Sequence, residues 1–107
     1  MIDRKKLIRT MDSLGYRESM KGTSYFREAI MLLDANPRSS MYYDIYPGVA
    51  AAVGATPARV ERAMRAATEV AMESPTWDET WKELGGWGEP TSREIVFRLA
   101  RELKEVS

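Results

Sequence analysis

The chain has 107 residues, with 16 lysines and arginines against 16 aspartates and glutamates, so its formal net charge is zero. This length fits one compact domain, and 44% hydrophobic with 30% charged residues is typical of a globular chain. The absence of cysteine and histidine excludes disulfides, thiolate catalysis, Cys/His zinc sites and Ser-His nucleophiles. No targeting or membrane-spanning stretch is visible, so we expect a cytoplasmic protein with no membrane partner.

Apolar residues recur at helical spacing throughout, without alternating strands or hairpin dipeptides. We therefore predict an all-α fold, a single six-helix domain over residues 1–107. The expected helices are 3–14, 23–35, 41–53, 57–73, 77–84 and 92–105. Pro47 leaves two alternatives for the third helix. It either kinks 41–53, or it begins the helix proper after a separate turn over 41–46.

The junction between the third and fourth helices has the pattern of a helix-turn-helix, over about residues 46–73. Gly54-Ala55-Thr56 is a turn of the required length and contains glycine. Thr56 is a plausible N-cap, and Pro57 fits the first helical position. The helix 57–73 would then be the recognition helix, supported by the helix before it.

Positions about 100° apart around the axis divide the helix 57–73 into two faces. The predicted buried stripe consists of Val60, Ala63, Met64, Ala67, Val70 and Ala71. The opposite face carries Arg59, Arg62, Arg65, Ala66, Glu69 and Glu73, with Glu61 at its edge. The arginines precede the acids, which is the order that the helix dipole disfavours, and a nucleic-acid contact would explain this placement.

Direct readout of DNA is the chemistry that this face suggests. Arginine pairs bidentately with guanine and glutamate accepts from the cytosine amine, so Arg62 and Glu61 are candidates for base contacts. Thr56 and the free amides of the first turn could hold a phosphate. The alternative is a solvated face, in which Glu61 and Arg65 form an i,i+4 pair worth about 0.2–0.5 kcal/mol. The zero net charge argues against strong non-specific DNA binding.

Several runs resemble the C-terminal effector domain of the sporulation master response regulator of endospore-forming Firmicutes. The most specific is Arg-Val-Glu-Arg-Ala-Met-Arg at residues 59–65, within a longer match over 46–71. Residues 21–30 are similar to the family's Lys-Gly-Tyr-x-Tyr-Leu-Arg-Glu-Ala-Ile segment. Residues 89–95 are similar to its Lys-Pro-Thr-Asn-Ser-Glu-Phe run. The resemblance extends from about residue 7 to residue 104.

The resemblance implies sequence-specific binding to double-stranded DNA at TGTCGAA-type boxes, often in tandem. It assigns Arg59, Glu61, Arg62 and Arg65 to DNA-facing positions, with Glu61 and Arg62 on bases. We include the neighbouring Thr56, Ala58 and Ala66 among the expected DNA-contacting positions. It further implies a homodimer on tandem boxes, with RNA polymerase as a further partner, and no cofactor or metal.

The chain departs from the family pattern in four ways. Ala66 stands where the family usually has histidine, the segment before the last helix is shorter, and residues 21–24 lack a frequent aromatic. The family's N-terminal receiver domain, an α/β module of about 100 or more residues, is not expected here. We expect an excised effector domain or a stand-alone version, and the Met1 start favours the second. A stand-alone version would be controlled by its abundance, by a partner or by intrinsic dimerisation.

Aromatic residues gather on both sides of the recognition helix. Trp77, Trp81 and Trp87 are expected to pack against the last helix, with a partner surface as the alternative. Of the three tyrosines at 42, 43 and 46, we expect two in the core and one directed outward. The acids at 78, 79 and 83 have nothing nearby to complete a catalytic or metal site, so no enzyme is predicted.

Two functions therefore follow from the sequence. The first is a sequence-specific transcriptional regulator that binds double-stranded DNA through the helix 57–73. The second is a protein-interaction module, a decoy or heterodimer partner of a full-length regulator, without specific DNA binding. Ala66 and the zero net charge are the features that support the second.

Overall fold

The structure, a computed structural model, describes residues 1–104. This part of the chain contains six α-helices, one short π-helical turn and no β-strand, which confirms the predicted all-α class. The elements in chain order are α1 (Arg4–Leu14), α2 (Lys21–Ala35), η1 (Met41–Ile45), α3 (Tyr46–Val53), α4 (Pro57–Ala71), α5 (Trp77–Glu83) and α6 (Ser92–Glu102). Among the described residues, no helix is both long and apolar enough to cross a membrane.

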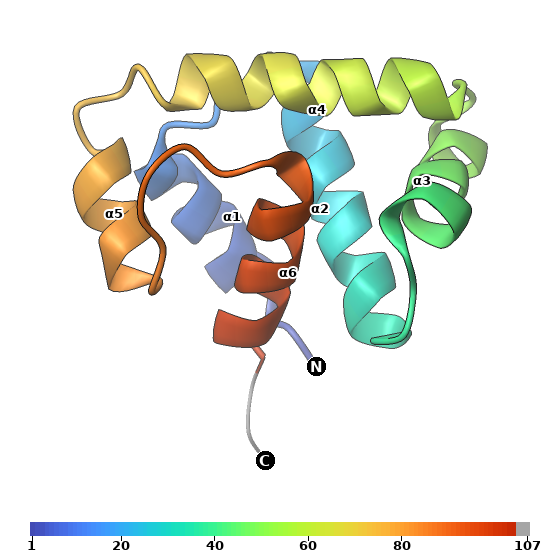
Figure 1. The fold of residues 1–107 in the computed structure, drawn as a ribbon, viewed down its shortest axis with the longest axis horizontal. Coiled ribbons are helices and arrows are strands. Elements are labelled where there is room, and N and C mark those ends of the chain that lie inside the picture. Colours follow the sequence, from blue (N-terminus) through green and yellow to red (C-terminus); the bar gives the residue numbers. More distant parts are fainter. Residues whose placement is uncertain (105–107) are drawn as a thin grey trace.

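Helix α2 is the central element, and it contacts α1, α3, α4 and α6. In Figure 1, α4 runs across the top of the molecule, α2 descends beneath it, α3 and α5 lie at opposite ends, and α6 lies in front. The largest fully buried side chains come from every helix except α5, and they are Phe26, Leu7, Met11, Leu14, Ile30, Ile45, Met64, Ile95, Leu99, Val49, Val60 and Val96. Burial of this one continuous core holds α4 across the ends of the other helices.

The crossing of α2 and α4 requires a glycine. A Cβ atom on Gly22 would lie 2.0 Å from the carbonyl oxygen of Ala63 and 2.8 Å from the Cβ atom of Ala67. Because backbone atoms of α4 cannot move away from such a contact, any larger residue at position 22 would push the two helices apart. Gly22 therefore sets the depth at which α4 sits on α2.

Buried aromatic contacts also fix α4 from the side. The hydroxyl of Tyr16, in the connection after α1, lies 2.8 Å from the hydroxyl of Thr68 on α4. Both residues are buried, and the Tyr16 ring makes edge contacts with Phe26 and Trp77. Burial raises the pKa of Tyr16 well above its ordinary value of 10.0, so this phenol stays neutral. The sequence patterns did not indicate this contact.

Three predicted helix bounds need correction. α2 begins at Lys21 rather than residue 23, because the preceding residues form a turn whose Arg17 carbonyl accepts the Thr23 hydroxyl at 2.7 Å. α4 ends at Ala71 rather than residue 73, because the chain already turns there, with a bond from the amide of Ser74 to the Ala71 carbonyl. α6 ends at Glu102, and the predicted end at residue 105 lies outside the described residues.

The segment around Pro47 follows the second of the two alternatives. η1 forms a separate turn capped by Ser40, whose hydroxyl oxygen accepts from the amide of Tyr43 at 3.0 Å. α3 then begins at Tyr46, with Pro47 in its first turn, where the missing N–H costs nothing.

Two predictions about aromatic residues are wrong in part. Trp77 and Trp81 are buried, as predicted, and their rings stack on each other, but Trp87 is 83% exposed. Helix α5 also packs mainly against α1, and not against the last helix as the sequence had suggested. Of the three tyrosines, only Tyr46 is buried, whereas Tyr42 and Tyr43 are 78% and 88% exposed. The reason is the η1 turn, which gives the inward positions to Met41 and Ile45 and leaves residues 42 and 43 outside.

Candidate nucleic-acid interface

The helix-turn-helix consists of α3, the turn 54–56 and α4. Gly54 ends α3 in the left-handed conformation, with φ of 71°, and α3 packs directly against α4. Thr56 then caps α4, because its side-chain oxygen accepts from the amide of Arg59 at 3.2 Å. Pro57 occupies the first position of α4. The turn, the cap and the proline are all as predicted from the sequence.

The two faces of α4 are separated as the sequence predicts, except that Thr68 joins the buried face. The buried residues are Val60, Met64, Ala67, Thr68 and Ala71, while Ala63 and Val70 are half-buried. The exposed residues are Ala58, Arg59, Arg62, Arg65, Ala66 and Glu69. At about 100° per residue, Arg62 lies at the centre of this exposed face, with Arg59 and Arg65 on its two flanks.

The side chains on this face make few contacts within the protein. The Arg62 guanidinium donates from Nε to the carbonyl oxygen of Ala58 at 3.4 Å, a long bond at the surface. One guanidinium nitrogen of Arg65 lies 3.7 Å from a carboxylate oxygen of Glu61, in the i,i+4 pair that the solvated-face alternative requires. This pair is screened by water, since 59% of the Arg65 side chain is exposed. The arginines are therefore available to an external anion.

Glu61 lies at the flank of the exposed face and not at its centre. Its side chain is 31% exposed, and it lies near the buried Tyr46 at the start of α3. Burial is the largest cause of a raised pKa at Tyr46, and the negative charge of Glu61 is the second. The positive charge of Arg65 acts in the opposite direction. The charges of Glu61 and Arg65 on α4 therefore act on the same phenol at the start of α3.

Residues 7–103 match the protein family described as "Sporulation initiation factor Spo0A C terminal". The chain belongs to this family. The match includes the helix-turn-helix and every residue of the exposed face of α4. As a member of the Spo0A C-terminal family, the chain is a DNA-binding domain of the sporulation transcription factor type, and this is not an enzyme family.

In this Spo0A C-terminal domain, the predicted contact residues do not all have the same exposure. Thr56, Ala58, Arg59, Arg62, Arg65 and Ala66 are exposed, whereas Glu61 is half-buried. The hydroxyl group of Thr56 uses one lone pair for its cap, so its hydrogen remains available as a donor. Ala66 lies one turn beyond Arg62 and contributes no hydrogen-bonding group. Polar recognition on this face therefore depends on the arginines, Glu61 and Thr56.

Sequence reasoning missed two features of this site. The buried contact between Tyr16 and Thr68 joins residues far apart in the chain, and no local pattern could indicate it. The exposed pair Tyr42 and Tyr43 stands just before α3, with the Tyr42 ring 5.6 Å from the ring of Tyr46. Regular helical spacing could not have indicated this exposure, because η1 is a π-helical turn with a longer repeat.

Proposed function

We propose that this chain binds double-stranded DNA sequence-specifically, at TGTCGAA-type boxes, through the exposed face of α4. The observation that carries the proposal is the position of Arg62, which lies exposed at the centre of that face with Arg59 and Arg65 on its flanks. Arg59 and Arg62 lie in the first half of the second helix of a helix-turn-helix, the part that reaches base edges in the major groove, and Arg65 lies just past its middle. Family membership supports the DNA-binding role.

The proposed roles differ between the residues. Arg62 donates two hydrogen bonds to O6 and N7 of a guanine, the commonest specific arginine contact. Glu61 accepts from the amine of a cytosine, for which its carboxylate must separate from Arg65. The freed Arg65 and the opposite Arg59 then bind bases or neighbouring phosphates. Breaking this exposed ion pair costs little, because such pairs contribute about 0–1 kcal/mol.

The small residues of the same face have a steric role in this proposal. Ala58 and Ala66 are exposed on either side of Arg62, and their size lets α4 lie deep in the major groove. An alanine methyl can also contact the methyl group of a thymine. At the start of the helix, the Thr56 hydroxyl and the amide of Ala58 would hold a phosphate, since Pro57 has no N–H and the Arg59 amide donates to the cap. Two copies on tandem boxes, with RNA polymerase as a further partner, complete the proposal.

The competing candidate is a protein-interaction module, a decoy or heterodimer partner of a full-length regulator. The ion pair between Glu61 and Arg65 is the observation on its side, because this pair gives two of the proposed contact residues a role without DNA, and the zero net charge points the same way. The two candidates differ in their dependence on salt. Phosphate contacts release counterions, so the logarithm of a DNA association constant falls linearly with the logarithm of salt concentration.

The deciding experiment is fluorescence anisotropy with a labelled duplex that carries two tandem TGTCGAA-type boxes. A scrambled duplex of equal composition is the control, and each is titrated with the protein at two salt concentrations. We expect tight, salt-sensitive binding that prefers the boxes. Equal, weak binding to both duplexes would overturn the proposal, and retention of a full-length regulator in a pull-down would then support the interaction module.

A further inference from the structure

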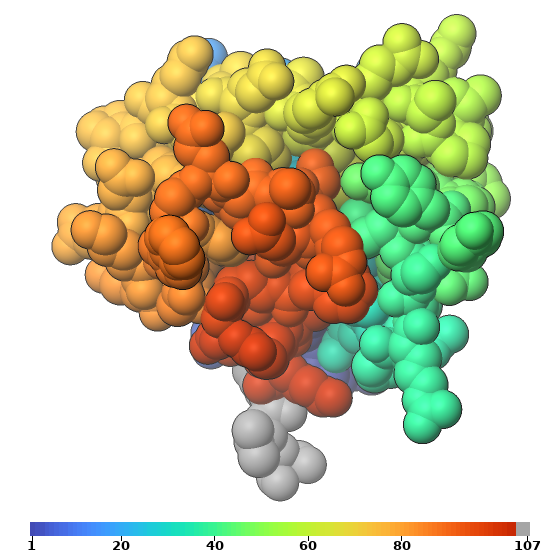
Figure 2. Space-filling model, viewed as in Figure 1, coloured from blue at the N-terminus to red at the C-terminus, as the bar shows by residue number. Residues whose placement is uncertain are grey.

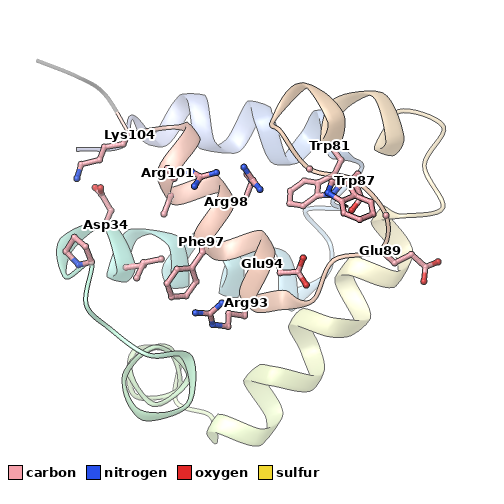
Figure 3. A pocket seen from close by; sticks show the side chains of 15 residues that line it. Asp34, Trp81, Trp87, Glu89, Arg93, Glu94, Phe97, Arg98, Arg101 and Lys104 are labelled. Carbon is pink, nitrogen blue, oxygen red and sulfur yellow. The ribbon is translucent and has the colours of Figure 1, made fainter.

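A groove of about 700 Å³ lies along the outer face of α6, away from the exposed face of α4. Figure 3 shows Trp81 and Trp87 on one side of α6, Asp34 on the other, and Phe97 between them. In Figure 2 the surface of α6 lies between the loop that precedes it and the segment after α2. No residue of α4 lines the groove, so it is separate from the proposed DNA contacts. Its volume lies in the range of pockets that bind ligands or side-chain anchors.

Trp87 is an exposed aromatic side chain on a fixed backbone. A Cβ atom on Gly86 would lie 2.1 Å from the Trp81 ring, so only glycine lets the loop pass over this buried indole. The Trp81 indole donates to the carbonyl oxygen of Trp87 at 3.4 Å, and the Trp81 ring itself stacks on Trp77. The loop is thereby held against the core while 83% of Trp87 remains exposed. Exposed tryptophans on a fixed support are enriched at binding hot spots.

Positive charge follows one side of the groove. Arg93, Phe97 and Arg101 are spaced four residues apart on α6, so they form one stripe about 12 Å long. The guanidinium of Arg93 lies 4.5 Å from the centre of the Phe97 ring, and Lys104 extends the stripe beyond the helix. Within the part of the chain that the structure describes, Arg101 forms only a long ion pair with Glu102, at 3.8 Å, and 69% of its side chain is exposed. Its guanidinium can therefore also contact a ligand.

Two of the carboxylates that line the groove, those of Asp34 and Glu94, already serve the fold. Asp34 accepts from the backbone amide of Ile2 at 3.0 Å, and Glu94 belongs to the capping box of α6 with Thr91. These acids stand on both sides of the cationic stripe, where they would repel a continuous chain of phosphates. A polypeptide can place its carboxylates against the arginines alone and direct apolar side chains at Trp87 and Phe97. The arrangement therefore favours a peptide over a nucleic acid.

We propose that this groove is a docking site for an acidic segment of a partner protein, which inserts apolar side chains between Trp87 and Phe97 and pairs its carboxylates with Arg93 and Arg101. The segment binds in the manner of an amphipathic helix in a groove, with anchors at helical spacing. Because the groove shares no residue with the face of α4, the domain can bind DNA and this partner at the same time. The inference does not depend on the proposed function.

The test begins with a library of random 14-residue peptides displayed on phage, selected on the wild-type protein and counter-selected on Trp87→Ala. Selected peptides are then synthesised, labelled and titrated by anisotropy. We expect sequences rich in Asp and Glu with large apolar residues at helical spacing. Trp87→Ala and Arg101→Glu should each weaken binding by about tenfold or more, as at other interface hot spots. Arg9→Glu, an equal charge change at an exposed position of α1, should leave binding unchanged.

Tryptophan signals locate the bound peptide independently. Trp77 and Trp81 are buried, so Trp87 is the indole exposed to solvent. A bound peptide should reduce the quenching of its fluorescence by acrylamide and shift its indole N–H resonance in NMR spectra. Failure to select peptides, selection of basic ones, or equal binding by Arg101→Glu and Arg9→Glu would overturn the proposal. Displacement of the selected peptide from Trp87 by a short duplex would overturn it too, because the groove would then bind nucleic acid.

Discussion

Two helices that pack on the same central helix present very different surfaces. Helix α4 lies along the top edge of the molecule (Figure 1), and the arginines of its exposed face stand between alanines with few contacts of their own. The outer face of α6 is concave, and its arginines line a groove beside an exposed indole. Projecting charge suits a rigid polyanion that receives the helix into its groove, whereas a concave aromatic site suits a flexible polypeptide. In the two proposals made above, similar charge is therefore assigned to different ligands according to the shape around it.

The largest effect is expected from a substitution in α2, the helix on which α4 and α6 both pack. Gly22→Ala should lower the free energy of unfolding by about 3 kcal/mol, because its Cβ would collide with the Ala63 carbonyl and overpack the crossing. Urea denaturation measures this, and hydrogen exchange should show greater loss of protection in α4 than in α6.

Gly48→Ala is the matched control within α3. There the new Cβ would lie 3.0 Å from the terminal methyl of Leu32, which can rotate away. Alanine also has the higher helix propensity, so stability should change by less than about 1 kcal/mol. Equal destabilisation by the two substitutions would contradict the assignment of the α2–α4 crossing to Gly22.

The second prediction contrasts one arginine from each surface. Arg62→Ala should weaken binding to the TGTCGAA-type duplex by about 1–3 kcal/mol and relax specificity at one base pair. Arg101→Ala removes the same charge from α6, and its effect on DNA binding should be much smaller. Anisotropy titrations of both variants, at one salt concentration, provide the measurement. If the two variants lost affinity equally, only net charge would matter and the two surfaces would not be distinct.

The third prediction concerns the buried bond that fixes α4. Tyr16→Phe removes the hydroxyl that lies 2.8 Å from Thr68, which should cost about 1 kcal/mol of stability. The variant also changes the response to alkali. The unfolded chain ionises Tyr16 near its ordinary pKa of 10.0, whereas burial raises the pKa in the folded state and keeps the phenol neutral.

The folded state therefore binds more protons above that pH, and stability falls as the pH rises. Above about pH 10, the ionisation of Tyr16 in the unfolded chain should lower the free energy of unfolding by up to about 1.4 kcal/mol per pH unit. This pH dependence should be absent below about pH 9, and absent at every pH in Tyr16→Phe. Denaturation of both proteins between pH 8 and about 12 measures the difference. Parallel curves for wild type and variant would show that Tyr16 ionises equally in both states.

The smallest effect concerns the ion pair on α4. Glu61→Gln should change stability by only about 0.2–0.5 kcal/mol, because the pair is exposed and 3.7 Å long. Its effect on DNA should instead appear as altered preference at a cytosine position. Glu69→Gln on the same helix, which has no ion pair among residues 1–104, is the control. A loss of several kcal/mol on Glu61→Gln would mean that the pair is structural.

The sequence predicted the parts of this molecule that depend on local order. Helical spacing identified the six helices, and the Gly-Ala-Thr-Pro run identified the turn, because capping and proline preferences act within a few residues. The two faces of α4 also followed from spacing alone. These features need no knowledge of what packs against them.

Features that depend on distant contacts were missed. The exposure of Trp87 follows from the passage of Gly86 over Trp81, and the burial of Thr68 follows from its bond to Tyr16. The π-helical turn at η1 shifted the tyrosines outward, and a period of 3.6 does not describe such a turn. The groove on α6 combines three separate segments, so no single stretch of sequence could indicate it.

The pairing of Ile2 with Lys104 has a practical consequence for engineering the domain. An antiparallel bridge joins these two residues at the bottom of the molecule, while α4 lies across its top (Figure 1). In a body that measures 34 by 33 by 23 Å, a fluorescent protein fused near either residue would stand well away from α4. The same closeness suits circular permutation of the domain, since a short peptide could join Ile2 to Lys104 and the chain could be opened in the connection after α2.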